Sequence, residues 1–545
     1  MAEELKTLID DLLEKQQLLT PVTRFSQKQE SHLLPKQARY YQDLIPLSKP
    51  KQGEQYAFQV ELDLCSGCKA CVTACHSLNG LEEEEIWRNV GFLHAPAGEK
   101  PFQQTITTAC HHCVDPGCLN GCPVDAYDKE EETGIVRHLD DQCIGCSYCV
   151  MKCPYDVPKY SEKKGIVRKC DMCHSRLSVG EAPACVQACP HEAIQIIIVD
   201  KEAIKNETKI NQTIVPDAPL SSYTVPTTQY RSKKGLPTHL LAADRHQLKA
   251  DQGHTPLAIM LVLTQASVGF IGIDLLARLM DWPISQPWSA VIAILLGVAG
   301  MISATLHLGQ PLKAWRFFVG LRHSWLSREI LAFSLYLPLL FLYTLWLWTP
   351  EMNFLPAELP TFLFKSTTGL ILGGTTVFIG LIAVGTSIMI YHDTTKPLWK
   401  WSRSGIKFYG TALLLGVAGV VTSSWIENST CTEAHTLLLQ TWMAAGFLKL
   451  LFEIKFLRHV KSNSWSPDKR SALVQIKTLK FESGIRFFLG FIGGILIPLA
   501  ILIAPQNEAL FWISFHGFIL LTAGEIFERS LFFKSVSSAK MPGTP

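Results

Sequence analysis

The chain has 545 residues, more than a single compact core accommodates, so two or more domains are expected. Its formal net charge of +2 gives no reason to expect a nucleic-acid partner, and its 18% of charged residues with a mean hydropathy of +0.16 is unusual for a soluble protein of this length. The residues are unevenly distributed. Sixteen of the 17 cysteines lie between Cys65 and Cys189, and long apolar runs begin only after residue 255.

Residues 1–54 are predicted to be an N-terminal extension. They begin MAEELKTLIDDLLEKQQLL, which is acidic from the third residue and lacks the apolar core and cleavage site of a signal peptide, so no export signal is expected. One helical face is apolar and predicts a short amphipathic helix. This helix either packs on its own domain or docks to a partner subunit. The face consists of Leu5, Leu8, Ile9, Leu12 and Leu13.

Residues 55–200 are predicted to be a cysteine-dense domain with four groups of four cysteines. The groups are Cys65, Cys68, Cys71 and Cys75; Cys110, Cys113, Cys118 and Cys122; Cys143, Cys146, Cys149 and Cys153; and Cys170, Cys173, Cys185 and Cys189. Disulfides suit secreted chains, and zinc sites favour paired CxxC units or Cys/His mixtures. A CxxCxxCxxxC run is instead typical of bacterial iron–sulfur proteins, in which the fourth cysteine ligates the neighbouring cluster. Sixteen cysteines then predict four [4Fe–4S] clusters.

A short helix and a strand are predicted after each CP pair, which indicates an α+β double ferredoxin-like domain. In order and spacing, residues 55–200 resemble the four-cluster electron-transfer subunit of the dimethyl sulfoxide reductase family of molybdenum enzymes. The resemblance implies that the first cysteine group pairs with the fourth and the second with the third. The implied ligand sets are Cys65, Cys68, Cys71 and Cys189; Cys75, Cys170, Cys173 and Cys185; Cys110, Cys113, Cys118 and Cys153; and Cys122, Cys143, Cys146 and Cys149.

Four histidines flank the cysteines and are predicted to pack, or alternatively to tune cluster potentials through hydrogen bonds to sulfur. They are His76, His111, His112 and His174. Beyond the cysteines, residues 201–250 are polar and rich in turn-forming residues, which predicts a linker that either hangs free or lies across the iron–sulfur domain.

Residues 251–535 are predicted to be an all-α polytopic membrane domain, followed by a tail at 536–545. Eight apolar runs have the length of a membrane span, with a buried helical core as the alternative. The short repeat LLGVAG at 295–300 and 414–419 indicates close helix packing or a duplication. The predicted spans are 256–278, 287–309, 328–348, 368–390, 406–425, 435–457, 484–504 and 510–533.

Basic residues concentrate in the connections after the even-numbered spans, including Lys313, Arg316, Lys400 and Arg403, whereas opposite connections such as NSTCTEA are nearly bare. The positive-inside rule therefore places the iron–sulfur domain on the cytoplasmic side of a bacterial plasma membrane. The same basic connections have an alternative role, which is to bind that domain.

Ionisable residues near membrane depth are candidates for function. HLGQPLKAWRFFVGLRHSWLSRE, from His307 to Glu329, and HTPL at 254–257 resemble the membrane-anchor subunit of the same family, which oxidises menaquinol and carries no haem. The resemblance implies that His307 and Glu329 bind quinol, and both side chains can accept its protons. The alternatives are a helix cap for His307 and an ion pair with Arg322 or Arg328 for Glu329.

Other polar residues of the membrane half are weaker candidates. Secondary quinol candidates are Tyr391, His392 and Arg403; His516 and Glu525 are predicted to pack or form ion pairs; and Cys431 is predicted to be incidental.

Together these features predict a fused electron-transfer and membrane-anchor subunit. Electrons pass from menaquinol through four clusters to a separate molybdopterin catalytic subunit, and quinol oxidation is the only chemistry expected in this chain, which should hold neither haem nor molybdopterin. The cluster of Cys146 should lie nearest the quinol and that of Cys68 nearest the partner. The terminal substrate, an S-oxide, an N-oxide, nitrate or another oxyanion, is left open.

Three alternatives remain. One is reverse flow from a donor such as formate into the quinone pool. Another is a redox-driven ion- or proton-translocating module, which acidic or histidine pairs at mid-bilayer depth on several helices would favour, and such pairs are sparse in this sequence. The last is an anchor without electron transfer, which would need no cluster ligands.

Overall fold

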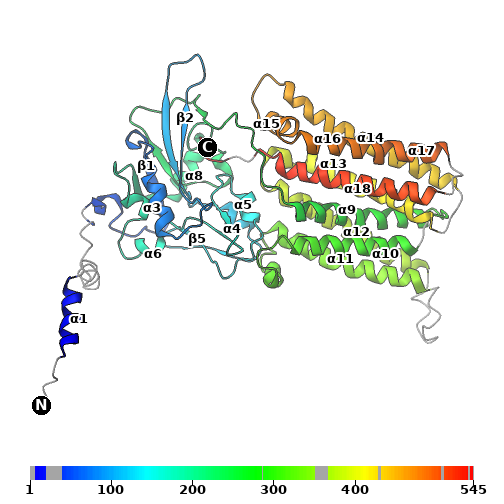
Figure 1. The fold of residues 1–545 in the computed structure, drawn as a ribbon, viewed down its shortest axis with the longest axis horizontal. Helices are drawn as coiled ribbons and strands as arrows, with labels where there is room; N and C mark the ends of the chain where they lie inside the picture. The colour runs from blue at the N-terminus through cyan, green and yellow to red at the C-terminus, as the bar shows by residue number, and fades with distance from the viewer. Residues whose placement is uncertain are drawn as a thin grey trace.

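The molecule has two parts that lie side by side along its longest axis (Figure 1). The computed structural model describes residues 7–19, 38, 40–284, 287–349, 366–426, 431–504, 509–537 and 540–543. The amino-terminal part contains the described β-strands, and the carboxyl-terminal part is a bundle of long helices. The first part is called here the iron–sulfur part and the second the helical part.

Strands β1 (Glu54–Glu61) and β8 (Ile194–Asp200) join the two ends of the cysteine-dense region. They pair antiparallel over seven residue pairs. Because β1 leads into the first cysteine group and β8 follows the fourth, this pairing brings these two groups together. Helix α3 (Ala70–Leu78) of the first group packs against α7 (Ala184–Gln187) of the fourth.

The second and third cysteine groups form a similar unit, in which α4 (Gly117–Gly121) packs against α5 (Tyr148–Lys152). Two antiparallel hairpins accompany these helices. They are β4 (Tyr127–Lys129) with β5 (Val136–His138), and β6 (Lys159–Ser161) with β7 (Ile166–Arg168). Paired short helices flanked by strands confirm the predicted α+β ferredoxin-like architecture. The predicted order is wrong in one respect, because α4, α5 and α7 lie before their CP pairs and each carries a cysteine of its group.

Residues 201–250 lie on the iron–sulfur part, which is one of the two placements expected of the linker. They contain helix α8 (Lys201–Ile210), strand β9 (Gln229–Arg231), which pairs parallel with β1, and strand β10 (Leu241–Ala242). Strand β10 pairs with β2 (Asn89–His94), which pairs in turn with β3 (Gln103–Thr108). Strands of two and three residues give no alternating sequence pattern, and they form because β1 and β2 offer free edges.

Helix α1 (Leu8–Leu19) lies apart from the rest of the molecule (Figure 1). Its described apolar side chains are more than half exposed, and the predicted member Leu5 lies outside the described residues. Packing on its own domain is therefore not found in the described part of the chain, and partner docking stays a prediction. The exposed side chains are Leu8, Ile9, Leu12 and Leu13.

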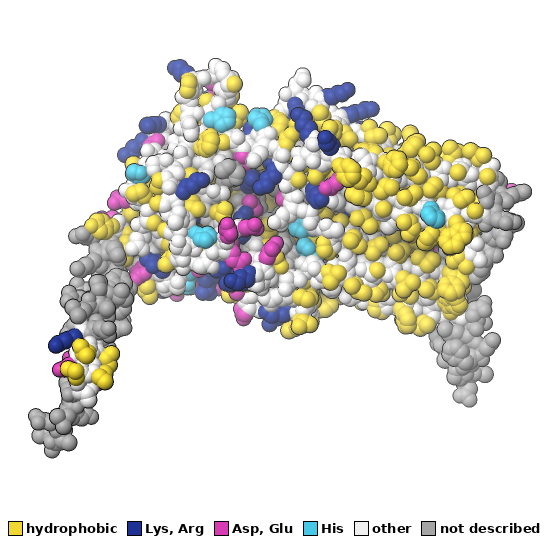
Figure 2. Space-filling model, in the orientation of Figure 1, with side chains coloured by type: hydrophobic (Ala, Val, Ile, Leu, Met, Phe, Trp, Pro, Cys, Tyr) yellow, Lys and Arg dark blue, Asp and Glu magenta, His cyan; other side chains and the backbone are white. Residues whose placement is uncertain are grey.

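The described helical part contains eight helices long and apolar enough to cross a bilayer, as predicted. Figure 2 shows an apolar surface over this part, whereas charged side chains gather over the iron–sulfur part and the junction. Helices α9 and α13 are the most enclosed, with 72% of the most apolar window of each buried, against 33–39% for the other six. The spans are α9 (Thr255–Leu279), α10 (Pro287–Thr305), α11 (Trp325–Trp348), α12 (Ser366–His392), α13 (Trp401–Ser424), α14 (Glu433–Leu457), the run from α16 (Lys480–Phe491) through α17 (Ile497–Ile503), and α18 (Leu510–Lys534).

The second span ends earlier than the predicted residue 309, because α10 stops at Thr305. The chain then turns into a short 3-10 helix, η5 (Pro311–Phe318). The backbone N–H of Gln310 donates to the carbonyl oxygen of Ile144 in the iron–sulfur part, at 3.0 Å. Because α10 ends at Thr305, residues 306–324 lie outside the helix and contact the iron–sulfur part.

Glycines let the central helix α9 approach its neighbours closely. A Cβ atom at Gly269 of α9 would collide with the backbone of α13, and one at Gly416 of α13 would collide with Gly269. A Cβ at Gly300 of α10 would lie 2.9 Å from α9. Both copies of LLGVAG, at 295–300 and 414–419, therefore mark contacts with α9, which supports the packing interpretation.

Seven charged side chains gather among α13, α14, α16 and α18. Glu525 pairs with Lys449 and with Arg486, the latter at 2.9 Å, so the predicted ion-pair role of Glu525 is confirmed. These residues are scattered in sequence, and only helix packing brings them together. The expectation that acidic or histidine pairs are sparse at mid-bilayer depth stays a prediction. The seven residues are Lys407, Lys449, Glu453, Arg486, Glu525, Glu528 and Arg529.

We expect Glu525→Gln to destabilise the protein by about 3–5 kcal/mol, because it leaves the buried Lys449 ammonium without its carboxylate partner. Thermal unfolding in detergent measures the loss. The matched control is the double variant Glu525→Gln with Lys449→Met, which removes both charges and should recover much of the stability. A single variant as stable as the parent protein would contradict this role of the pair.

Candidate functional site

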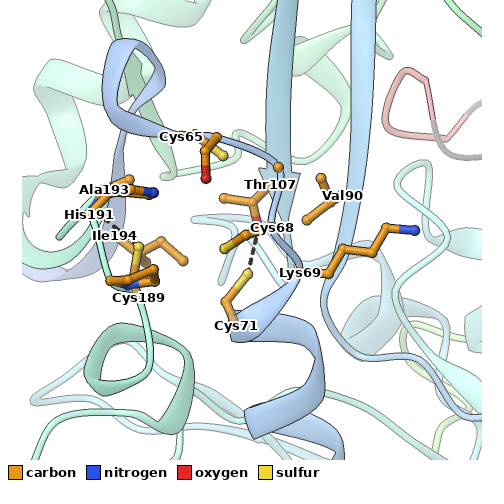
Figure 3. Close-up of a pocket in the computed structure, with 13 residues that line it drawn as sticks. Cys65, Cys68, Lys69, Cys71, Val90, Thr107, Cys189, His191, Ala193 and Ile194 are labelled. Carbon is orange, nitrogen blue, oxygen red and sulfur yellow. Dashed lines mark hydrogen bonds between the residues drawn. The ribbon is translucent and has the colours of Figure 1, made fainter.

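Cys65, Cys68, Cys71 and Cys189 line one cavity of the iron–sulfur part (Figure 3). The first three come from the loop and first turn of α3, and the fourth from the loop before β8. Burial raises the pKa of the Cys65 thiol, and the nearby Cys71, Cys189 and Cys68 raise it further. Thr107 Oγ1 lies 3.6 Å from Cys71 Sγ. Cysteines of the first and fourth groups thus surround one space.

A second set of thiols gathers from the same two groups. Burial raises the pKa of Cys75 to about 12, and Cys185 and Cys173 contribute to this shift. Cys170 is also close to Cys75 and Cys185. The buried guanidinium of Arg88 opposes the effect of burial at Cys75 and Cys185. This cation is therefore placed to stabilise negative charge on the set.

A third set lines another enclosed space and consists of Cys110, Cys113, Cys118 and Cys153. Lys169 is 2% exposed, and its Nζ lies 3.7 Å from Cys110 Sγ. A buried ammonium needs an anionic or hydrogen-bonding partner. Thiolates that hold a metal cluster would supply negative charge at this position.

The fourth set lies where the two parts meet and consists of Cys122, Cys143, Cys146 and Cys149. Burial raises the pKa of Cys149 well above its ordinary value, and Cys146, Cys143 and Cys122 add to the shift. The backbone N–H of Ala126 donates to Cys122 Sγ at 3.2 Å. The third and fourth sets therefore each combine cysteines of the second group with cysteines of the third group.

These sets fit iron–sulfur clusters better than single metal ions. Among the described residues, no three His, Cys, Asp or Glu side chains are close enough to share one ion. A cubane is larger and holds its four sulfur ligands farther apart than zinc does. Backbone N–H groups also donate to the sulfur atoms of Cys143, Cys170 and Cys189, at 3.4, 3.4 and 3.3 Å, which stabilises thiolates.

The histidines beside the cysteines are held mainly by the protein. His76 Nε2 lies 3.0 Å from the Glu82 carbonyl oxygen, and His174 Nε2 lies 3.0 Å from a Glu130 oxygen. His112 Nδ1 accepts from a backbone N–H, so its Nε2 carries the proton, yet that atom is buried without a partner among the described residues. His111 Nδ1 lies 2.8 Å from Thr228 Oγ1. Protein contacts therefore hold all four histidines, while the Nε2 atoms of His111 and His112 are buried without a partner among the described residues.

The helical part docks against the fourth cysteine set. The backbone N–H of Gly320 donates to the Pro123 carbonyl oxygen at 2.9 Å, and Ser324 Oγ donates to the Gly121 carbonyl oxygen at 2.8 Å. These contacts surround Cys122, whose carbonyl oxygen also lies 3.0 Å from Nε2 of His323 in the same connection. They hold this cysteine set at the membrane-facing side of the iron–sulfur part.

Basic residues of the same connection contact the iron–sulfur part. Lys313 Nζ and Arg316 Nη1 donate to the Asp141 carbonyl oxygen, at 2.9 and 3.0 Å. In the opposite sense, Lys152 pairs with Asp393 after α12 at 2.5 Å. The alternative role for the basic connections is therefore supported, and membrane orientation stays a prediction.

A cavity of about 300 Å³ lies between the fourth cysteine set and the helices. Cys146, His307 and Glu329 all line it. Most of the remaining wall is apolar or aromatic, which suits a ring-bearing lipid-soluble ligand. This wall includes Leu257, Met260, Trp315, Phe317, Phe318, Leu326 and Phe333.

His307 lies in the connection after α10. Its ring centroid is 5.1 Å from that of His254, with the two rings nearly perpendicular. Its Nε2 is buried without a hydrogen-bond partner among the described residues, and burial lowers the pKa of the ring. The side chain does not cap the helix, because the hydrogen bond to Ala304 comes from the His307 backbone. A neutral ring with a free nitrogen can bind a ligand hydroxyl.

Glu329 lies in the first turns of α11 and is 4% exposed. Ser387 Oγ of α12 donates to its carboxylate. The alternative of an ion pair is not supported among the described residues, since Arg328 donates to the backbone oxygens of Leu321 and Arg322. The carboxyl group therefore faces an apolar cavity with one hydroxyl partner.

The secondary candidates separate into two groups. Tyr391 lines the cavity, whereas His392 Nδ1 accepts from the backbone N–H of Trp401 and Arg403 pairs with Asp468. Ser387 could not be predicted, because one hydroxyl in an apolar helix carries no sequence signal. His254 of the HTPL motif also has no role predicted from sequence.

Comparisons with known proteins agree with this geometry. A family model described as "DMSO reductase anchor subunit (DmsC)" matches residues 251–534. This protein belongs to the dimethyl sulfoxide reductase anchor subunit family. A second model, "4Fe-4S dicluster domain", matches residues 102–198, so this member of the family carries an iron–sulfur region and the anchor in one polypeptide.

Similar curated proteins cover the iron–sulfur region. One polypeptide of the anaerobic dimethyl sulfoxide reductase of Haemophilus influenzae is 35% identical over 172 residues, which are 30% of this chain and 83% of the relative. Its counterpart in Escherichia coli K12 is 36% identical over 159 residues, 27% of this chain and 75% of the relative. The "Formate dehydrogenase-O iron-sulfur subunit" of E. coli K12 is 34% identical over 158 residues, 26% of this chain and 52% of that protein.

The anchor family and these relatives define the role of the chain. It is the electron-transfer iron–sulfur subunit and the membrane anchor of a dimethyl sulfoxide reductase-family complex, which also has a catalytic subunit. It is a multi-pass membrane protein with eight candidate spans.

Proposed function

We propose that the chain takes electrons from a quinol, menaquinol in the first instance, and passes them through four [4Fe–4S] clusters to a separate molybdopterin catalytic subunit. The observation that carries this proposal is the shared cavity of Cys146, His307 and Glu329. It combines a cluster ligand with two proton acceptors in an apolar space that is open to a lipid-soluble ring.

The cluster ligands we propose are the four sets described above, each with four cysteines. When bound, the clusters supply one-electron acceptors in series. The set with Cys146 is the entry point because it borders the cavity. The set with Cys68 is the exit, because Cys68 is exposed and α3 lies on the side of the iron–sulfur part away from the helices (Figure 1).

The residues of the cavity handle the protons of the reaction. Quinol oxidation releases two protons with its two electrons. His307 Nε2 is placed to accept one proton from a quinol hydroxyl. The Glu329 carboxylate, which accepts a hydrogen bond from Ser387, is placed to accept the other proton. The apolar walls exclude water and orient the ring.

Quinol-dependent bleaching of the visible cluster absorbance tests this proposal. The purified complex should carry iron in all four sets and lose absorbance when a reduced menaquinone analogue is added. Iron-loaded complex that bleaches with dithionite and stays unchanged with quinol would contradict it.

The reverse direction is a second candidate because a formate dehydrogenase iron–sulfur subunit is among the similar proteins. In that case electrons enter from the catalytic subunit and reduce quinone in the same cavity. The catalytic subunit that co-purifies decides the direction and names the substrate class, such as an S-oxide, an N-oxide, nitrate or formate.

We propose that the iron–sulfur part faces the cytoplasm, so the opposite helix ends face the periplasm. Cys431, the one cysteine outside the four groups, precedes α14 at the end remote from the iron–sulfur part. A membrane-impermeant maleimide should therefore label Cys431 in intact cells, after outer-membrane permeabilisation where one exists. The variant Cys431→Ser is the control for background labelling. Labelling only after the inner membrane is broken would contradict this orientation.

A further inference from the structure

The cavity lined by Cys146, His307 and Glu329 is called here the quinol cavity. A second cavity, of about 350 Å³, lies beside it between the iron–sulfur and helical parts. Its lining includes many charged side chains, in contrast to the mostly apolar quinol cavity. Figure 2 shows charged side chains gathered at this junction. We call this cavity the polar groove. Its charged lining residues are Glu84, Asp156, Lys159, Glu162, Lys249, Asp251, Lys396, Arg470 and Lys540.

Two histidine rings connect the cavities. His307 lines the quinol cavity and His254, directly before α9, lines the polar groove. Their ring centroids lie 5.1 Å apart and their planes meet at 88°. The His254 ring also contacts Phe533 of α18, with centroids 5.4 Å apart. The pair therefore forms an ionisable bridge from an apolar to a polar space.

Protons taken from a quinol need such a bridge. The wall of the quinol cavity is mostly apolar or aromatic, and its Glu329 is buried with Ser387 as partner. A proton taken up in this cavity therefore needs a further ionisable group that connects the cavity to a polar space. Imidazole accepts a proton on one nitrogen and releases one from the other, so two adjacent rings can pass protons in sequence.

We propose that His254 relays the quinol protons from His307 to the polar groove, so that they leave on the side of the iron–sulfur part. This inference rests on the proposed function. Each quinol would become a quinone by giving its two electrons, one at a time, to the cluster that Cys146 would help to hold, and its two protons to groove water. The first proton passes from His307 to His254, and the second is held by Glu329 until His307 is deprotonated again.

The charged surroundings of His254 suit a relay that is neutral at rest. Burial, His307 and Lys396 lower the pKa of the His254 ring, and Asp251 raises it, with a net value of about 4. Asp251 comes from the segment before α9, Lys396 from the connection after α12, and α18 contributes the uncharged Phe533. A proton that reaches this ring is therefore released readily into the groove.

The variant His254→Phe tests the relay in the purified complex with its catalytic subunit. Phenylalanine keeps an aromatic ring against His307 and Phe533 but carries no proton. We expect quinol-driven cluster bleaching to slow by about 100-fold, the scale of a lost proton-transfer group, with binding of a fluorescent quinol analogue unchanged. Phe533→Leu is the matched control, because it alters the same ring contact and should keep both properties.

Chemical rescue provides a second measurement. In His254→Gly, free imidazole added from the aqueous side should enter the groove and restore bleaching in a saturable way, whereas pyrrole, which cannot accept a proton at its ring nitrogen, should not. In proteoliposomes with a trapped pH indicator, the parent complex should release protons on the iron–sulfur side.

The outcomes distinguish the two proposals. Absence of quinol-driven bleaching in the parent complex would overturn the proposed function. The relay alone would be overturned if quinol bleached the clusters of the parent complex and of the His254→Phe variant at the same rate. Proton release on the side opposite the iron–sulfur part would also overturn the relay alone. Loss of analogue binding in His254→Phe would also overturn it, because His254 would then hold the ligand instead of its protons.

Discussion

Replacing Cys146 by serine is expected to reduce quinol-driven bleaching of all four clusters to background. Cys146 is both a member of the fourth cysteine set and part of the cavity wall beside His307 and Glu329. Serine is a poor ligand for iron in place of thiolate, so the entry cluster is lost or its potential changes. Electrons from the cavity then have no first acceptor, although the other sets remain intact.

A matched substitution at the other end should behave differently. Cys68→Ser removes a ligand of the set with Cys65, Cys71 and Cys189, which lies away from the helices. Quinol should still bleach the remaining clusters, while turnover by the catalytic subunit stops.

Iron content and an artificial donor complete the measurement for both variants. Each should lose about a quarter of the iron, since one of four clusters is affected. A reduced viologen that donates directly to the catalytic subunit should still support its turnover. Quinol-driven bleaching of normal extent in Cys146→Ser would contradict the assigned entry point.

The local features of this protein could be predicted because they are written in short stretches of sequence. The spacing of Cys65, Cys68, Cys71 and Cys75 is a ligand pattern by itself. The membrane spans follow from the length of apolar runs, and all eight are found. Roles for His307 and Glu329 came from a resemblance, and the structure brings both to one cavity.

The features that could not be predicted from the sequence depend on contacts between distant segments. His254 lies before α9 and His307 after α10, and their rings meet only in the folded protein. The apolar patterns of these two helices do not predict this contact. The charge cluster around Glu525 takes its members from four helices, each of which contributes between one and three charged positions to an apolar stretch. Periodicity describes the faces of one helix and contains no information about which helix lies opposite.

The junction shows how such contacts change the interpretation of sequence signals. Lys313 and Arg316 count toward the positive-inside rule, yet both donate to the Asp141 carbonyl oxygen. Their presence is explained by docking of the cysteine set onto the helices. Membrane orientation therefore needs a direct measurement, and labelling of Cys431 provides it.

Glu329→Gln is expected to slow quinol-driven cluster bleaching by about 100-fold or more, because the carboxylate accepts a proton that an amide cannot accept. The substitution is nearly isosteric, and Ser387 Oγ can still donate to the amide oxygen. Binding of a fluorescent quinol analogue should weaken little, since the apolar wall supplies most of the contact area. Stopped-flow absorbance measures the rate and fluorescence titration the binding.

The control for this variant is Ser387→Ala, which leaves the carboxylate in place but removes its hydroxyl donor. It should have a smaller effect than Glu329→Gln if proton acceptance is the role of Glu329. Equal losses in the two variants would indicate that the hydrogen-bonded geometry matters and the proton does not. Since dithionite delivers electrons without quinol chemistry, both variants should still be reduced by it at the parent rate, and a slow dithionite reaction would place the defect in the clusters instead of the cavity.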